Sequence, residues 1–107
     1  MQNDNSLFVD FFGNYPIIRT IDFLIENDIF DYSKKDIANN SNVSWNTLEN
    51  FWKTLEEKEI VTYTRKVGKA RMYKLNSENP IVKQLMELDK QFMRKSLNEE
   101  KIRAVAR

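Results

Sequence analysis

Residues 33–75 have the sequence SKKDIANNSNVSWNTLENFWKTLEEKEIVTYTRKVGKARMYKL, in which a helical spacing of apolar residues gives way to a β-branched and aromatic run. At its start Ser33 and Asp36 are spaced as a capping box, in which a serine oxygen and a carboxylate bond to free amides at a helix N-terminus. This spacing predicts a short helix with Ile37 and Ala38 facing inward.

A second helix is predicted after a tight turn. Asn and Ser residues at 39–42 favour a turn because their side chains compete for backbone hydrogen bonds. Ser44 then has the position of an N-cap. The apolar residues that follow it are spaced as on one buried helix face: Leu48, Phe51, Trp52 and Leu55. Two short helices joined by a polar turn form a helix-turn-helix.

The next segment predicts a β-hairpin. Residues 60–64 are β-branched and aromatic, which favours a strand, and residues 71–75 are predicted to form a second strand. Gly68 lies in the loop between them, as expected of a hairpin turn. Four basic residues occupy the predicted tip of this hairpin: Arg65, Lys66, Lys69 and Arg71.

Helices are also predicted on both sides of this run. Ser6 precedes an aromatic run at helical spacing, and Pro16 opens a helix with an apolar stripe: Leu7, Phe8, Phe11 and Phe12, then Ile17, Ile21, Leu24 and Ile25. Asn79 and Pro80 begin a long terminal helix. Residues 96–99 repeat the capping-box pattern, so a break there is an open alternative. The fold class expected is mainly α with a small β-hairpin (α+β).

Composition excludes several classes of protein. The 107 residues contain no Cys and no His, which removes disulfide scaffolds, thiol nucleophiles, the usual zinc sites and histidine-based catalysis. The two isolated Gly residues cannot form a phosphate-binding loop. We therefore expect no enzyme activity, no cofactor and no metal. The sequence shows neither a signal peptide nor a membrane-spanning stretch, so a cytoplasmic protein is expected.

Charge is unevenly distributed along the chain. The net charge is +1, which by itself argues against nucleic-acid binding. However, residues 1–32 contain one basic and six acidic residues, whereas residues 58–74 contain six basic residues and one acidic residue. Segregation of this kind predicts one positive edge on a nearly neutral fold.

The order of these elements resembles the winged helix-turn-helix fold, and most closely the small archaeal winged-helix transcriptional regulators of the broad MarR/ArsR type. Four stretches carry the resemblance: YSKKDIA at 32–38, VSWNTL at 43–48, LEEKEIV at 55–61 and RKVGKARMYKLN at 65–76. The absence of linkers and repeats predicts a single domain. We expect an N-terminal helix in 1–13, the winged helix-turn-helix core in 14–76 and a C-terminal helix in 79–107.

The resemblance implies that the helix at 44–58 enters the major groove of double-stranded DNA. Asn46 and Asn50 are predicted to lie on one outward face, where asparagine pairs with adenine. Ser44 and Thr47 are candidates for phosphate contacts, although an ordinary cap is the primary role expected of Ser44. The other candidate DNA contacts are Trp45, Lys53, Lys34 and Lys35, with the four basic residues of the wing at 65–71 on phosphate or the minor groove.

Two aromatic residues and one acidic residue of this helix have distinct expectations. Trp52 continues the apolar stripe and is expected in the core. Two roles are open for Trp45: contact with thymine methyls or sugars, and packing onto the preceding helix. Glu49 is expected to repel phosphate, although a glutamate also accepts a hydrogen bond from cytosine.

The terminal helix has an apolar seam with a 4, 3, 4 spacing: Ile81, Leu85, Leu88 and Phe92. Many proteins that this chain resembles dimerise through such helices, which implies a homodimer. The alternative is packing of the seam on the N-terminal phenylalanines of the same chain, and both hold if the N-terminal helix joins the interface. An aromatic ligand cavity near Phe8, Phe11, Phe12 and Tyr15 is a further alternative to plain core, and any effector is unknown.

These observations predict a sequence-specific regulator of transcription, with repression as the default mode. The competing hypothesis is a winged-helix module for protein interaction or assembly, without specific contact to DNA bases.

Overall fold

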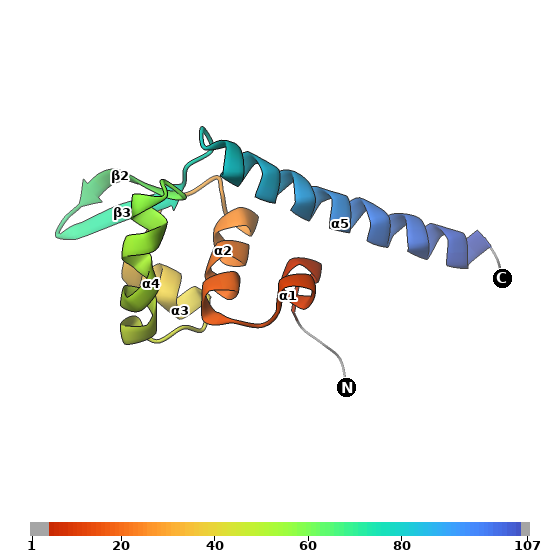
Figure 1. Ribbon diagram of the computed structural model, residues 1–107, viewed down its shortest axis with the longest axis horizontal. Helices are drawn as coiled ribbons and strands as arrows, with labels where there is room; N and C mark the ends of the chain where they lie inside the picture. The colour runs from red at the N-terminus through yellow and green to blue at the C-terminus, as the bar shows by residue number, and fades with distance from the viewer. Residues whose placement is uncertain (1–4, 106–107) are drawn as a thin grey trace.

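The structure, a computed structural model, describes residues 5–105 of the chain. Its elements in order are α1 (Leu7–Phe12), α2 (Pro16–Glu26), β1 (Tyr32–Ser33), α3 (Lys34–Asn40), α4 (Trp45–Glu57), β2 (Val61–Val67), β3 (Ala70–Leu75) and α5 (Pro80–Val105). The outermost parts of the predicted 1–13 and 79–107 segments, residues 1–4 and 106–107, lie outside the described residues. The β2–β3 hairpin, or wing, extends from one end of the molecule and α5 from the other (Figure 1).

The sheet has three antiparallel strands in the order β1-β3-β2. The predicted hairpin is therefore correct but incomplete, because β1 pairs with β3 through Tyr32 opposite Tyr73 and Ser33 opposite Met72. A strand of two residues is too short to show the alternation by which strands are recognised in a sequence.

The hairpin turn is shorter than the sequence suggested. Only Gly68 and Lys69 separate the two strands, and Gly68 has a φ of 60°, which glycine adopts without steric cost. The prediction that Arg65, Lys66 and Arg71 lie at the tip is wrong, because these residues belong to the strands. The pairing of β2 with β3 continues through these basic residues as far as Val67 opposite Ala70.

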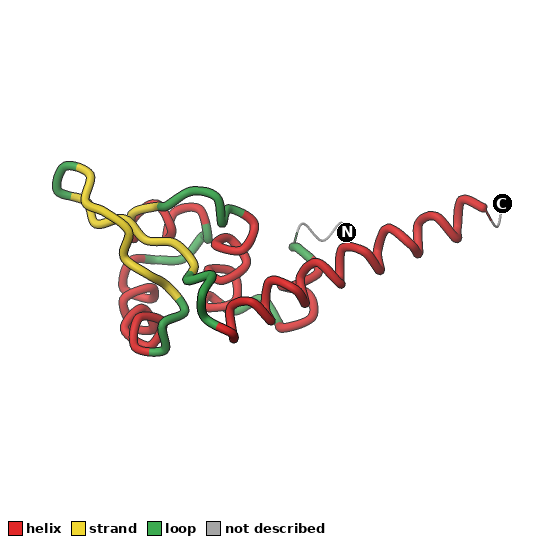
Figure 2. Tube along the Cα trace, turned by 90° about the horizontal axis from the view of Figure 1, so that it is seen from above, coloured by secondary structure: helices red, strands yellow, loops and turns green. Residues whose placement is uncertain are grey.

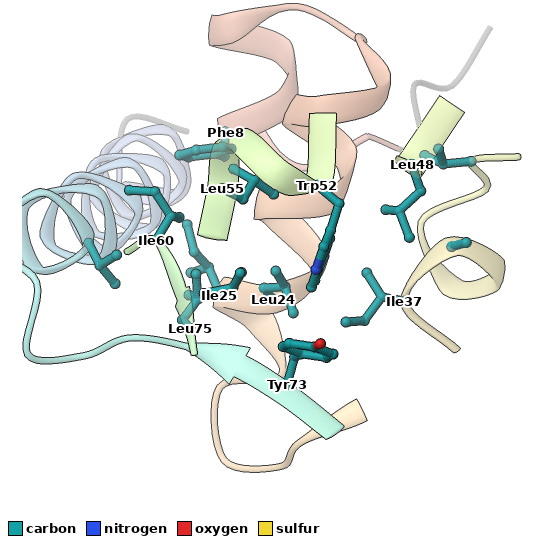
Figure 3. Packing of buried hydrophobic residues seen from close by; sticks show 14 residues of the cluster. Phe8, Leu24, Ile25, Ile37, Leu48, Trp52, Leu55, Ile60, Tyr73 and Leu75 are labelled. Atoms are coloured by element: carbon teal, nitrogen blue, oxygen red, sulfur yellow. The ribbon is translucent and has the colours of Figure 1, made fainter. Parts of the chain in front are cut away.

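The core lies between the helices and the sheet (Figure 3). Trp52 of α4 is 1% exposed, and its ring meets Tyr73 of β3 edge-on at a centroid distance of 5.2 Å. This confirms Trp52 as a core residue. The predicted apolar stripes of α2 and α4 also face inward, in part fully buried and in part packed against the buried cluster: Ile17, Ile21, Leu24 and Ile25, with Leu48, Phe51 and Leu55.

Side-chain caps explain where the helices begin. The hydroxyl oxygens of Ser6, Ser33 and Ser44 accept hydrogen bonds from the amides of Val9, Asp36 and Thr47, at 3.1, 3.1 and 3.2 Å. Each serine thereby satisfies one free amide of the first helical turn. The predicted starts of α1, α3 and α4 are confirmed, since each of them begins directly after its capping serine.

Helix α5 is continuous from Pro80 to Val105. The helix therefore does not break at residues 96–99, which was the open alternative. Ser96 is followed and preceded by residues with high helix propensity, which outweigh the local capping pattern. Figure 2 shows the C-terminal part of this helix extending beyond the other helices. Among residues 5–105, no helix combines the length and apolar character needed to cross a membrane.

Candidate nucleic-acid interface

The turn between α3 and α4 is held by a residue of another helix. Arg19 of α2 donates from Nε to the Ser41 carbonyl and from Nη2 to the Asn42 carbonyl, both at 3.0 Å. Its Nη1 donates to the side-chain and backbone oxygens of Asn14 at 3.0 and 3.3 Å. Asn42 has a φ of 55°, a left-handed conformation that asparagine tolerates. Arg19 therefore fixes the turn that orients α4.

Arg19 was not predicted as a functional residue. One signal in the sequence pointed to it, because it is the only basic residue among residues 1–32. A lone cation in an acidic segment suggests a specific partner. Most of its partners are backbone carbonyls, which every residue type has and which a sequence therefore does not reveal.

The outward side of α4 carries exposed polar residues. We define its reading face as Trp45, Asn46, Asn50 and Lys53, all exposed. No hydrogen bond involves the side chains of Asn46 or Asn50 within residues 5–105, so both amides are available to a ligand. Lys53 lies 3.8 Å from Glu57 in an ion pair whose members are 85% and 64% exposed, an arrangement that contributes little stability.

The hydroxyl groups of Ser44 and Thr47 lie together at the N-terminus of α4. Ser44 Oγ accepts the Thr47 amide proton and also lies 2.8 Å from Thr47 Oγ1. The expected capping role of Ser44 is confirmed. A phosphate contact by either hydroxyl stays a prediction.

Lys34 and Glu49 form an ion pair across the helix-turn-helix. The Lys34 side chain is only 22% exposed, and its Nζ lies 5.2 Å from the centroid of the Trp45 ring and 5.7 Å from that of Trp52. Cation–π attraction adds to the ion pair in this position. The carboxylate that was expected to repel phosphate is thus neutralised, and Lys34 is turned inward rather than toward solvent.

Trp45 packs toward the preceding helix and stays partly exposed, and its contact with DNA stays a prediction. The Lys34 ammonium lies over the Trp45 ring, yet Trp45 is 50% exposed. A mostly apolar hollow of about 340 Å³ lies beside the ring and is lined by Lys35, Ala38, Asn39 and Trp45. Trp45 therefore packs toward α3 and still offers aromatic surface at the start of α4.

A β-bulge divides the basic residues of the wing between two faces. Tyr63 lies opposite Tyr73, Arg65 opposite Met72 and Lys66 opposite Arg71, so Thr64 is the extra residue of β2. Side chains alternate between faces along a strand, and Tyr73 packs against α4. Lys66 and Arg71 consequently share the face of the sheet that α4 covers, whereas Arg65 lies on the other face.

Arg65 anchors the wing to the loop before β1. Its Nε and Nη2 donate to the two carboxylate oxygens of Asp31 at 3.0 and 3.2 Å, and the Thr64 hydroxyl donates to the same carboxylate. Hydrogen bonds from Arg65, and then from Thr64, lower the pKa of Asp31 to about 2. Asp31 is therefore ionised at neutral pH and engages the Arg65 charge.

The remaining wing cations lie differently. The Arg71 guanidinium stands 4.4 Å from the centroid of the Tyr63 ring, and its Nε donates to the Tyr73 hydroxyl at 3.2 Å. These contacts place Arg71 without neutralising it. Lys66 and Lys69 are exposed and form no ion pair within residues 5–105, as is also true of Lys35. Among the four basic residues at 65–71, those without an ion pair in the described chain are thus Lys66, Lys69 and Arg71.

Helices α1 and α5 form a second surface, distant from the reading face. Phe92 of α5 contacts Phe11 of α1 at a centroid distance of 5.2 Å, so part of the seam packs on its own chain. The expectation that the N-terminal phenylalanines are plain core holds for Phe8, but Phe11 is 68% and Phe12 36% exposed. Helix α1 has only six residues, and the aromatic residues on the side that faces away from the core are left exposed.

The other seam residues line an open hollow. The hollow has a volume of about 480 Å³ and is lined by Pro80, Ile81, Gln84, Leu85 and Leu88. Ile81 is 58% exposed, whereas Leu85 packs partly against the core. We call this surface the α5 hollow. It leaves apolar area uncovered on a helix that continues past the rest of the described chain.

Three carboxyl groups face one another where α2 meets α5. Burial raises the pKa of Asp22, Glu26 and Asp89, and repulsion from Asp22 adds to the rise at the other two. The Ser6 hydroxyl, which donates to Asp22 at 2.7 Å, opposes the rise there. Within the described residues, no group of three His, Cys, Asp or Glu side chains is placed to hold a metal ion.

Comparison with known proteins identifies the fold. No protein-family model matches the sequence, and no curated protein matches it. MepR, a transcription regulator of the Staphylococcus aureus multidrug efflux pump MepA, has a similar structure, with a TM-score of 0.58 and 16% identity over 81% of this chain and 68% of MepR. A possible transcriptional regulator from Methanosarcina mazei Go1 gives a TM-score of 0.51 and 17% identity over 80% and 74% of the two chains. The chain has the winged-helix fold of these regulators, with flanking helices at both ends of the core.

Proposed function

We propose that the chain is a homodimeric regulator of transcription that binds specific sequences of double-stranded DNA. In this proposal α4 enters the major groove and the wing contacts the neighbouring phosphates or minor groove. The observation that carries the proposal is the shared orientation of two surfaces. On the reading face of α4, the side-chain amides of Asn46 and Asn50 are exposed and form no hydrogen bond within residues 5–105. Lys66 and Arg71 project from the same face of the sheet on which α4 packs.

Charge supports the same assignment. Phosphate contacts supply most of the affinity of proteins for DNA, whereas contacts to base edges supply specificity. The wing offers uncompensated cations and α4 offers neutral polar groups, so each surface matches one of these tasks. Lys35, Ser44, Thr47 and Lys53 are further candidates for phosphate contacts near α4. Lys34 and Arg65 are assigned to positioning, since Glu49 and Asp31 hold them.

We assign the α5 hollow, with Ile81, Leu85 and Leu88, to the dimer interface, joined by Phe11 and Phe92. A two-fold axis near α5 would place two copies of α4 on one face of the duplex, about 34 Å apart. A dimer bound across a promoter blocks polymerase, so repression is the mode we propose. We place such a regulator in the cytoplasm. The exposure of Ile29 and Phe30, 80% and 64%, favours protein interaction as the second candidate function.

Selection of bound duplexes from random double-stranded DNA tests this proposal. The expected product is an inverted repeat whose half-site centres are separated by about 10 base pairs or a multiple of one helical turn. The Asn46→Ala/Asn50→Ala variant is the matched control, because it keeps the wing and loses the unoccupied amides. Absence of enrichment with the wild-type chain at low salt would favour an interaction module instead.

A further inference from the structure

We propose that the first two turns of α4 recognise A·T base pairs, with Trp45 on a thymine methyl group and the asparagines on adenine. This inference rests on the DNA-binding function proposed above and names the bases that α4 contacts. Three features of α4 support it. Its first two turns lack arginine and lysine, their one carboxylate, Glu49, is held in an ion pair, and an apolar hollow lies beside Trp45.

Guanine has no suitable partner on α4. Its usual partners are arginine and lysine, which donate to O6 and N7 in the major groove. Residues 45–57 contain no arginine, and their single lysine, Lys53, lies in the third turn beside Glu57. The early turns therefore lack a cation that reaches a guanine edge.

Cytosine is also disfavoured. A glutamate accepts a hydrogen bond from its N4 amino group, and Glu49 is the only carboxylate in the first two turns of α4. Glu49 is held by Lys34, whose ammonium lies close to the faces of Trp45 and Trp52. Withdrawing Glu49 toward a base would leave Lys34, whose side chain is only 22% exposed, without its counter-charge, which is unfavourable. The ion pair thus removes the one group suited to cytosine.

The groups that are left suit the two bases of an A·T pair. Adenine presents N6 and N7 to the major groove and thymine its C5 methyl, and asparagine and apolar side chains are their respective partners. Asn46 and Asn50 are exposed. Trp45 is half-exposed beside the mostly apolar hollow of about 340 Å³, which has room for a methyl group. Since Trp45 and Asn46 are adjacent, both meet the groove at the first turn of α4.

Replacement of single thymidines by deoxyuridine tests the methyl contact, because it removes one methyl group and leaves base pairing unchanged. The probe is the duplex selected by the full-length chain. At one or two positions of each half-site we expect the affinity to fall about three- to fivefold, as for the loss of one buried methyl group. The Trp45→Ala variant should bind the thymidine and deoxyuridine duplexes with the same affinity within about twofold.

Two further variants sharpen the test. Thr54→Ala is the matched control, because Thr54 is exposed on α4 away from Trp45, and it should retain the full thymidine preference. Asn46→Ala should reduce the preference for adenine over guanine at its position by about fivefold or more. Circular dichroism shows whether each variant is folded, and the deoxyuridine series on the wild-type chain does not depend on any variant.

The outcomes separate this inference from the function on which it rests. Selected half-sites rich in A·T, with a deoxyuridine effect that Trp45→Ala abolishes, support it. Specific binding to G·C-rich half-sites, or wild-type affinity that is insensitive to every deoxyuridine, overturns it while leaving the DNA-binding function intact. Failure of the wild-type chain to bind any duplex overturns the proposed function itself.

Discussion

Replacing Ile81 and Leu88 together with aspartate should convert dimers of the chain into monomers and leave its helical content unchanged. Ile81 is 58% exposed and Leu88 half-buried, both beside the α5 hollow. A carboxylate placed in an apolar interface loses its hydration without gaining a partner, which opposes association. Leu85 is left unchanged because it packs partly against the core of its own chain.

The consequence for DNA binding should be large. Two linked binding modules gain about 10² to 10⁴ in affinity over one module, so the double variant should lose at least about 100-fold on an inverted repeat. Analytical ultracentrifugation and binding to the selected duplex measure the two effects. Lys83→Asp is the control, because Lys83 is exposed in the first turn of α5, where an added carboxylate is compatible with the helix dipole. A wild-type chain that sediments as a monomer at about 50 μM, far above the Kd of a specific dimer, contradicts the dimer.

Alanine at Asn46 or Asn50 should cost about 1 to 3 kcal/mol of binding free energy on the selected duplex. Both side chains are exposed and form no hydrogen bonds within residues 5–105. The melting temperature should therefore change little. Binding to duplexes of unrelated sequence should be nearly unaffected, because phosphate contacts do not depend on these amides.

Fluorescence anisotropy with the selected and a scrambled duplex measures both affinities. Thr54→Ala, on the same helix, should change neither of them. If the affinities for the two duplexes fall in parallel when Asn46 is replaced, this residue does not distinguish bases and the assignment of the reading face is wrong.

Local patterns predicted much of the fold. Each of Ser6, Ser33 and Ser44 fixes a helix start through a hydrogen bond to a residue three positions later, a distance that a sequence displays directly. The inward stripe around Trp52 follows in the same way from the helical period. Features that depend on neighbours within one turn are visible before a structure is known.

The partners of the charged side chains were not predictable. Arg65 binds Asp31, 34 positions earlier, and Arg19 binds the carbonyl of Asn42, 23 positions later. The bulge at Thr64 then decides which cations face α4. These pairings arise from the topology of the fold rather than from residue spacing. The sequence therefore identified the basic residues of the wing but not which of them are uncompensated.

The dependence of duplex affinity on salt tests DNA binding by the wing most directly. Each phosphate contact releases condensed cations, so removing one contact lowers the magnitude of the slope of log affinity against log salt by about one unit. Lys66 and Lys69 are exposed, and replacing both with glutamine should preserve the melting temperature. Lys95→Gln, an exposed position on α5, is the control.

We expect a steep slope for the wild-type chain, a flatter slope with weaker binding to all duplexes for Lys66→Gln/Lys69→Gln, and no change for Lys95→Gln. Negligible wild-type affinity for duplex DNA at low salt, or a slope that the wing substitutions leave unchanged, would contradict it.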